Sequence, residues 1–167
     1  GLVENGLRVT VLCESHERVS ILTDRGYGIE CFVNTKPYRT FALAPELGRY
    51  LIDNVARARG VCLINGMFHP SVYAMGRFLR RHGVPYVMVP HDPYDPVVFR
   101  RNPHLKWPYW YLFERRLLRA ARAVQVFDER HGAWLPRLGV HTRVIHTENG
   151  IAASSVAGES ELAWWGV

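Results

Sequence analysis

The residue with the clearest chemical potential is His91, which closely follows an apolar run, residues 84–89, and directly precedes Asp92. An imidazole titrates near neutral pH, and it can donate a hydrogen bond to a sugar hydroxyl or to a leaving phosphate. If the apolar run is a strand of a parallel sheet, His91 lies at its carboxyl end, where such sheets bind ligands. The alternative is that His91 is a structural residue of a turn.

A second candidate site follows another apolar run, residues 61–64. That run ends in Asn65, Gly66, Met67 and Phe68, and Pro70 then begins an amphipathic segment. A glycine at this point lets the backbone approach a ligand closely, and the free amides at the start of a helix can hold an anion. A plain strand-to-helix turn would have the same sequence, so both interpretations stay open.

Other reactive arrangements are disfavoured. His69, the pair His91–Asp92 and Asp128 occur in the order found in metal-dependent phosphohydrolases, but those enzymes carry such residues on helices, and here the pair follows a strand. Asp92 and Asp95 could form a carboxylate pair for a metal ion, although the adjacent prolines explain both as turn residues. The sequence contains no GxGxxG, GxxxxGK[ST] or GxSxG pattern.

The elements that position these residues alternate between short apolar runs and longer amphipathic ones. In residues 45–59, Leu47, Leu51 and Val55 recur at helical spacing after Pro45. Further helices are expected from residue 70 to the glycine at 83, at 108–121 and at 129–138, and residues 90–107 are expected to form a loop. The expected strands are residues 7–13, 29–33, 61–64, 84–89, 123–127 and 142–146.

Strands that are apolar on both faces and are separated by helices are typical of a parallel sheet covered on both sides. We therefore predict an α/β fold with a Rossmann-like, doubly wound parallel sheet of about six strands. The chain has 167 residues, of which 48% are hydrophobic. This is enough for one domain with its own core. No uncharged apolar stretch of about 18 residues occurs, and no secretion leader follows Gly1.

The cysteine content indicates a reduced, cytoplasmic protein, and the positive charge is compatible with binding an anionic ligand or surface. Cys13, Cys31 and Cys62 each lie inside an apolar run, without a CxxC pattern, and are expected to be separate, buried thiols. The formal charge of +6 comes almost entirely from arginine, which favours phosphates and carboxylates. Weak contact with an anionic membrane is compatible with this charge, whereas no motif for reading nucleic acid accompanies it.

Three segments together resemble the amino-terminal domain of family 4 glycosyltransferases. They are INGMFHPSVYAMGRFLRRHGVPYVMVPHDPYDP (residues 64–96), ERRLLRAARAVQVF (114–127) and LGVHTRVIHTENGI (138–151). In that family a strand ends in glycine, a helix follows, and the next strand is followed by a histidine or glycine. The resemblance is good over residues 57–151 and looser over residues 1–35.

The resemblance implies one half of the two-domain GT-B fold and retaining transfer of a sugar from a nucleotide-sugar to a hydroxyl acceptor, by front-face attack. It implies no cofactor and no metal, since the nucleotide-sugar is a substrate. His91 takes the position of the family's active-site histidine. Asn65, Gly66, Met67, Phe68, Asp92 and Tyr94 are assigned to the acceptor side, and Asn149 and Gly150 to the hinge between domains.

The chain also departs from the family pattern. The family's first strand is not recognisable, and no two glutamates lie eight positions apart, as the donor-binding motif of the second domain requires. We therefore expect residues 1–150 to be the acceptor-side domain of a truncated enzyme, inactive by itself, and residues 151–167 to lead towards an absent donor domain. Its place would be the cytoplasm or the inner membrane face, in polysaccharide biosynthesis. The alternative is a non-catalytic Rossmann-like module that binds a sugar or a partner.

Overall fold

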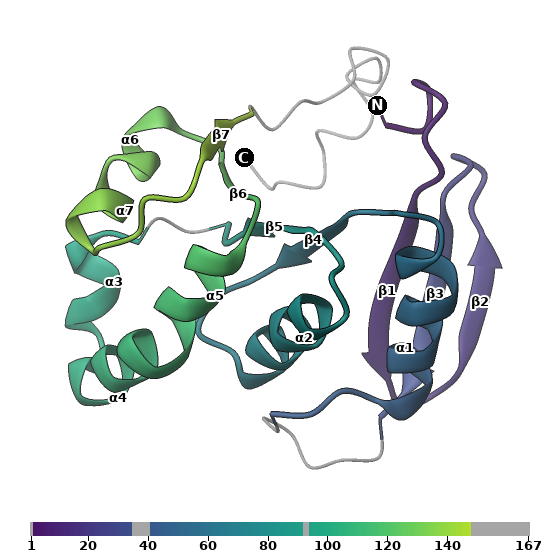
Figure 1. The fold of residues 1–167 in the computed structure, drawn as a ribbon, viewed down its shortest axis with the longest axis horizontal. Coiled ribbons are helices and arrows are strands. Elements are labelled where there is room, and N and C mark those ends of the chain that lie inside the picture. The colour runs from purple at the N-terminus through teal and green to yellow at the C-terminus, as the bar shows by residue number, and fades with distance from the viewer. Residues whose placement is uncertain (1, 35–40, 92–93, 148–167) are drawn as a thin grey trace, which may run out of the picture.

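The computed structural model describes residues 2–34, 41–91 and 94–147, and their strands form two sheets. In the first sheet β3 (Gly28–Val33) lies between β1 (Thr10–Ser15), to which it is parallel, and β2 (Val19–Leu22), to which it is antiparallel. The second sheet is parallel, in the order β4 (Cys62–Asn65), β5 (Tyr86–Val89), β6 (Ala123–Val126) and β7 (Val144–His146). Figure 1 shows both sheets.

The α/β class and the parallel sheet are therefore confirmed, but the single sheet of about six strands is corrected to a four-stranded parallel sheet and a small mixed one. The strand that sequence reasoning missed is β2. It lies antiparallel beside β3, and the two strands are joined by a turn in which the Gly26 amide donates to the Thr23 carbonyl. A four-residue strand with mostly exposed side chains has too little apolar periodicity to stand out.

The helices α1, α2 and α4 each begin with a proline in the first turn. Helix α1 (Pro45–Tyr50) continues as the π-helix η1 (Leu51–Ala56), and α2 (Pro70–Arg81) ends before the positive-φ Gly83. The predicted helix over residues 108–121 is longer: α4 (Pro103–Tyr109), the π-helix η2 (Trp110–Glu114) and α5 (Arg115–Ala120) follow one another without a break. The last helical segment is divided into α6 (Glu129–Gly132) and α7 (Trp134–Arg137).

The loop expected over residues 90–107 is wrong in its second half, which contains α3 (Pro96–Arg100) and the start of α4. Asp95 caps α3, because its side chain accepts a hydrogen bond from the Val98 amide at 3.0 Å. Pro96 and Pro103 each occupy the first helical turn, where a missing amide hydrogen costs nothing. The prolines that indicated a loop are therefore helix starts.

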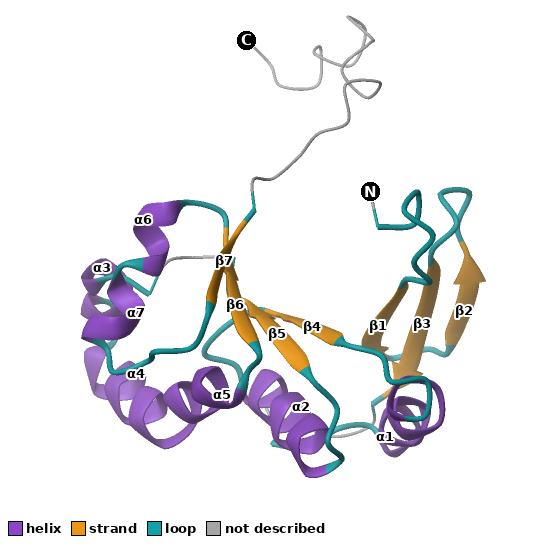
Figure 2. Cartoon of the chain, turned by 45° about the horizontal axis from the view of Figure 1, so that its top comes forward, coloured by secondary structure: helices purple, strands orange, loops and turns teal. Residues whose placement is uncertain are grey.

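The described helices do not cover both faces of every strand. Figure 2 shows α1, α2 and α5 on one side of the strands, and the remaining helices beside the β6–β7 end. Val11 of β1 is 46% exposed and Leu63 of β4 is 48% exposed. Both point away from the core, because strand side chains alternate and the adjacent Leu12 and Ile64 pack into it. Within the described residues the prediction of a doubly covered sheet is thus corrected for this part of the fold.

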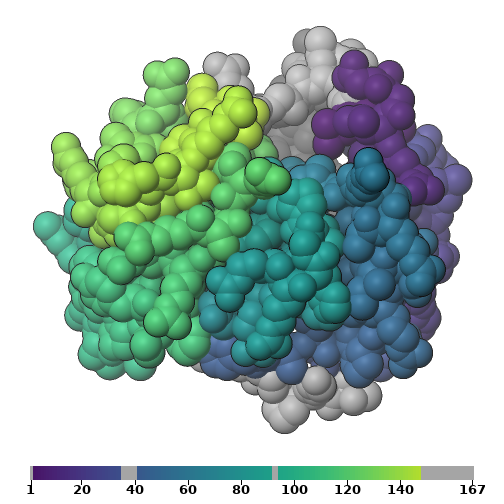
Figure 3. Space-filling model, in the orientation of Figure 1, coloured from purple at the N-terminus to yellow at the C-terminus, as the bar shows by residue number. Residues whose placement is uncertain are grey.

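The hydrophobic core lies between the parallel sheet and α2 and α5, and α1 extends it to the small sheet. Met88, Val124 and Leu118 are fully buried in it, and Phe32 of β3 joins it from the small sheet. The space-filling view in Figure 3 shows α1 and α2 next to each other as a continuous surface on the helix-covered side of the strands. This packing holds the strands, and therefore the strand ends, in fixed positions.

Candidate functional site

The site predicted at His91 lies at the carboxyl end of β5, an inner strand between β4 and β6. The His91 ring is exposed, and its Nε2 lies 3.0 Å from Asn65 Oδ1 at the end of β4. On its other side the ring packs against Phe127, which follows β6, with 5.6 Å between ring centroids. Three neighbouring strand ends therefore hold one solvent-facing imidazole.

The backbone at this edge is held in conformations that side chains rarely adopt. His91 has a φ of +65° and Gly66 a φ of +105°, and the Gly66 amide donates to the Val89 carbonyl at 3.0 Å. The left-handed region costs a side-chain-bearing residue about 1–2 kcal/mol relative to glycine. His91 therefore occupies a position where glycine would be easier, and backbone strain of this kind is concentrated at functional sites.

Phe68 joins the β4–α2 loop to an aromatic cluster in the interior. Its φ is +52°, and its ring centroid lies 5.6 Å from Phe99 and 6.0 Å from Tyr94. Lys106 Nζ lies 5.5 Å from the same ring centroid, in a cation–π arrangement. Met67, next to Phe68, is half-buried against the core. Of the four predicted residues in this loop, Asn65 and Gly66 therefore lie nearest to His91.

Tyr94 lies below this loop and not at its surface, because its side chain is only 2% exposed. Its hydroxyl donates a hydrogen bond of 2.6 Å to Oε1 of Glu114, the last residue of η2. Glu114 is fully buried, and its Oε2 and the Tyr109 hydroxyl have no hydrogen-bond partner within the described residues. Tyr94, which was predicted to contact the acceptor, therefore supports the β4–α2 loop from the interior of the domain.

Burial makes Glu114 titrate far from its usual range. The loss of hydration raises the pKa of Glu114 to about 7, against the opposing effects of the Tyr94 hydroxyl and the Phe68 backbone. Burial and the nearby Glu114 also raise the pKa of Tyr94 well above its ordinary value. Near neutral pH, folded molecules with a protonated Glu114 and folded molecules with an ionised Glu114 are therefore both present.

Several residues from the disfavoured arrangements have structural roles. His69 caps α2, since its Nδ1 accepts from the Ser71 amide, and Asp128 caps α6 by accepting from the Arg130 amide at 2.8 Å. The hydrogen bonds from Arg130 also hold the pKa of Asp128 well below its usual range. No group of three His, Cys, Asp or Glu side chains suited to a metal ion occurs in the described part of the chain.

Three predicted positions lie outside the described residues: Asp92, Asn149 and Gly150. Their assignment to the acceptor side and to the hinge therefore stays a prediction.

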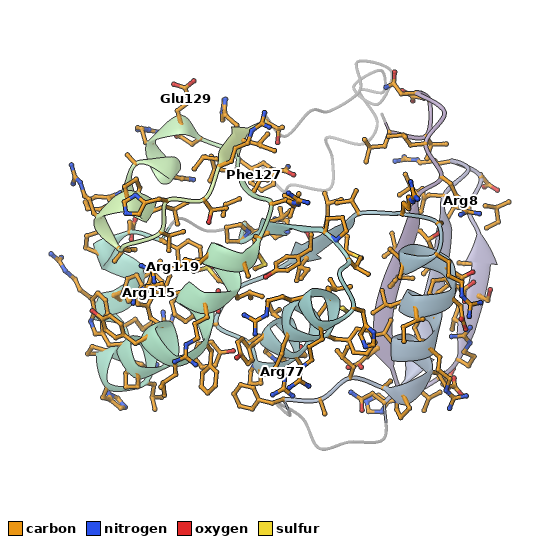
Figure 4. All side chains as sticks on the ribbon, viewed as in Figure 1. Arg8, Arg77, Arg115, Arg119, Phe127 and Glu129 are labelled. Carbon is orange, nitrogen blue, oxygen red and sulfur yellow. The ribbon has the colours of Figure 1, made fainter. Side chains whose placement is uncertain are left out.

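The arginines lie mostly away from the strand-end edge. Figure 4 shows Phe127 at the β6–β7 end of the sheet, whereas Arg77, Arg115 and Arg119 project from helices α2 and α5. Arg119 donates to the Gly139 carbonyl at 2.8 Å, so part of this charge anchors the loop before β7. The positive charge therefore does not single out the edge that carries His91.

A pocket of about 480 Å³ lies between α3, α4 and α7, separate from His91. Its lining is mostly apolar and includes Tyr94, Phe99, Trp107 and Trp134, with Arg100 and Arg137 among the other residues. Tyr94 is the one predicted site residue that reaches this pocket. The pocket and the His91 edge are therefore two distinct features connected by one aromatic side chain.

Sequence reasoning missed Glu114 and Phe127 as parts of this region. Phe127 was placed at the end of a strand, and the rule that neighbouring strand ends meet at one edge could have paired it with His91. Glu114 precedes the buried Leu117 and Leu118 by three and four positions, and this helical spacing was a signal that its carboxyl group lies on the buried face.

Comparison with known proteins gave one match. The family model described as Glycosyltransferase Family 4 matches residues 1–154. Searches of curated proteins and of solved structures found no significant match. No helix among the described residues has both the length and the apolar character that crossing a bilayer requires.

Proposed function

Since the chain belongs to glycosyltransferase family 4, a retaining family, over residues 1–154, we propose that it is the acceptor-side half of an enzyme that transfers a sugar from a nucleotide-sugar to a hydroxyl acceptor. The observation that carries the proposal is the exposed His91 imidazole at the carboxyl end of an inner parallel strand, held between Asn65 and Phe127. Parallel α/β sheets bind ligands at this edge.

His91 is proposed to make a polar contact with the transferred sugar. The Asn65 carbonyl oxygen at 3.0 Å orients the Nε2 side of the ring, and Phe127 supports one ring face. Because Nε2 donates to the Asn65 side-chain oxygen, Nδ1 of the neutral ring can accept from a sugar hydroxyl, and Nδ1 of a protonated ring can donate to a leaving phosphate oxygen. A ring fixed in this way loses little further entropy on making that contact, which is the basis of preorganised electrostatic catalysis. In an assay with both halves of the enzyme, His91→Ala should lower turnover about 100-fold or more.

The acceptor is proposed to lie against the β4–α2 loop, beside Asn65 and Gly66. The positive φ of Gly66 exposes backbone without a Cβ, and the Phe68 ring fixes the loop from below. Tyr94 and Glu114 support this loop and are not expected to touch the acceptor. Binding by the chain alone is expected, whereas transfer is not, because the sequence lacks the paired glutamates of the donor-binding motif.

The proposal is tested with the ¹⁵N-labelled chain and a panel of mono- and oligosaccharide glycosides, with uridine and guanosine diphosphate-sugars run in parallel. We expect a glycoside to shift the amide signals of Asn65, Gly66 and His91, and Asn65→Ala to weaken its binding about tenfold, the effect of one lost hydrogen bond. Asn54→Ala, at an exposed position of η1, is the matched control.

Two results would contradict the proposal. If no glycoside shifts the strand-end amides, or if Asn65→Ala and Asn54→Ala bind the glycoside equally well, the acceptor site is misplaced. If the purified chain consumes a nucleotide-sugar and glycosylates an acceptor, it is not one half of the enzyme.

A second proposal is that the chain meets its acceptor at an anionic membrane. The face of α4 and η2 carries exposed Leu105, Tyr111 and Leu112, and exposed Arg116 follows one turn later. An apolar stripe beside cationic side chains is typical of helices that lie in a membrane interface. Vesicles containing phosphatidylserine should co-sediment with the chain at low salt, and Leu112→Asp should reduce this; equal sedimentation with neutral vesicles would contradict the proposal.

A further inference from the structure

Two of the three cysteines face each other across neighbouring strands. The parallel register of β1 and β3 places Cys13 directly opposite Cys31, and their sulfur atoms are 2.7 Å apart. From the sequence they were expected to be separate, buried thiols, because each lies in an apolar run without a CxxC pattern. The two residues are 18 positions apart in the chain. Neighbouring strands are about 4.8 Å apart, which is within the range of Cα separations that a disulfide spans.

The pair lies on the face of the small sheet that α1 does not cover. Phe32 points into the core on the α1 side, so the adjacent Cys31 points to the opposite face, because strand side chains alternate. Val11, two positions before Cys13, is largely exposed, and both sulfur-bearing residues are only partly buried. Small molecules in solution can therefore reach the pair within the described structure.

We propose that Cys13 and Cys31 form a redox-active dithiol, which closes to an intramolecular disulfide by exchange with a low-molecular-weight disulfide such as oxidised glutathione. One thiol loses its proton and attacks a sulfur of the small disulfide, which forms a mixed disulfide and releases one small thiol. The second cysteine sulfur, on losing its proton, attacks the protein sulfur of the mixed disulfide and releases the second small thiol. The protein is oxidised by two electrons and the small disulfide is reduced by two.

The surroundings of this pair determine which thiol chemistry it can carry out. The hydrogen bond with the Cys31 sulfur is the main cause that raises the pKa of Cys13 to about 11, so this thiol keeps its proton at neutral pH. Exchange should therefore be slow at neutral pH and faster in alkaline solution, because the thiolate is the nucleophile. No third His, Cys, Asp or Glu completes a metal site within the described residues, so the pair is better suited to disulfide formation than to holding a metal ion.

Closure of the pair would link the two parallel strands near their carboxyl ends. The bond would restrict the unfolded chain, and the midpoint of thermal unfolding should rise by roughly 5–10 °C. Cys62 is a built-in control, because it belongs to β4 in the other sheet and burial raises its pKa to about 11.

The experiment treats the reduced, folded chain with oxidised glutathione and follows intact mass, then labels the remaining thiols after unfolding. We expect a product that is lighter by two hydrogen atoms and has one free thiol, at Cys62. The Cys62→Ser variant should form the same bond. The Cys13→Ser and Cys31→Ser variants should stop at a mixed disulfide with one glutathione, because each lacks the second sulfur.

The same oxidation in denaturant shows whether the fold selects the pair. Unfolded chains should also give disulfides that contain Cys62, whereas folded chains should not. The proposal is overturned if the folded chain keeps three free thiols after the unfolded chain has been oxidised, or if the bond in the folded chain contains Cys62.

Discussion

Replacement of Glu114 by glutamine should remove a large part of the pH dependence of stability. Glu114 is 0% exposed, and its Oε1 accepts the Tyr94 hydroxyl at 2.6 Å. Glutamine keeps the size of the side chain and a carbonyl oxygen for Tyr94, but it cannot ionise. The variant therefore separates the charge of this residue from its packing.

The magnitude follows from the difference between the folded and unfolded pKa. Burial raises the pKa of Glu114 from 4.5 to about 7, so between these values the folded chain holds a proton that the unfolded chain has lost. The stabilising contribution is complete below pH 4.5 and is lost as the pH rises through 7. Because one pKa unit corresponds to about 1.4 kcal/mol, the free energy of unfolding should fall by about 3 kcal/mol across this window.

The assay is urea unfolding of the natural chain and of Glu114→Gln, followed by tryptophan fluorescence at half-unit steps from pH 4.5 to 8. We expect the stability of the natural chain relative to the variant to fall by about 3 kcal/mol across this range. Glu46→Gln, at an exposed position in α1, is the matched control and should show no such change.

A difference that stays constant with pH, or that grows in favour of the natural chain, would refute the reasoning. A constant difference would mean that Glu114 ionises in the folded chain near its ordinary pKa, and a difference growing in favour of the natural chain would mean that its folded pKa lies below that value. The buried carboxyl group would then have compensating partners that the Tyr94 hydrogen bond does not supply.

Other substitutions test the packing around the site. Gly76→Ala should destabilise the chain by about 1–2 kcal/mol in urea unfolding, because a Cβ at this point of α2 would clash with Cδ1 of the buried Leu117. This overpacking outweighs the gain in helix propensity, and an equal or higher stability of the variant would contradict the prediction. His91→Gly should be about 1 kcal/mol more stable than His91→Ala, since the φ of +65° favours glycine, and equal unfolding midpoints would contradict the strain. Asp95→Ala should cost about 1 kcal/mol through the lost cap of α3, and an unchanged midpoint would show that the cap contributes nothing.

The parts of the fold that the sequence predicted correctly are those with strong local patterns. The helix from Pro70 was predicted from its proline, its periodic apolar side and the glycine at its end, and the structure confirms it as α2. The strand before His91 was predicted from its apolar run and is β5. Local patterns failed where the same residue type has two uses, as with Pro96 and Pro103, which lie in the expected loop but begin helices.

For the candidate site, the sequence located the two loops but not their internal support. It placed His91 and Gly66 after strands, and the structure brings Asn65 within hydrogen-bond distance of His91. It gave no reason to separate Tyr94 from the surface residues or to connect it with Glu114, 20 positions away.

The sequence by itself therefore determined the helices and strands and the reactive residues at their ends. Hydrophobic periodicity, capping residues and turn residues depend on only a few neighbouring positions, so they can be read locally. Only the tertiary structure decided which strands pair, that the strands form two sheets, and that Cys13 faces Cys31. Strand pairing joins residues far apart in the chain, and its register is set by burial of whole faces, which no local pattern records.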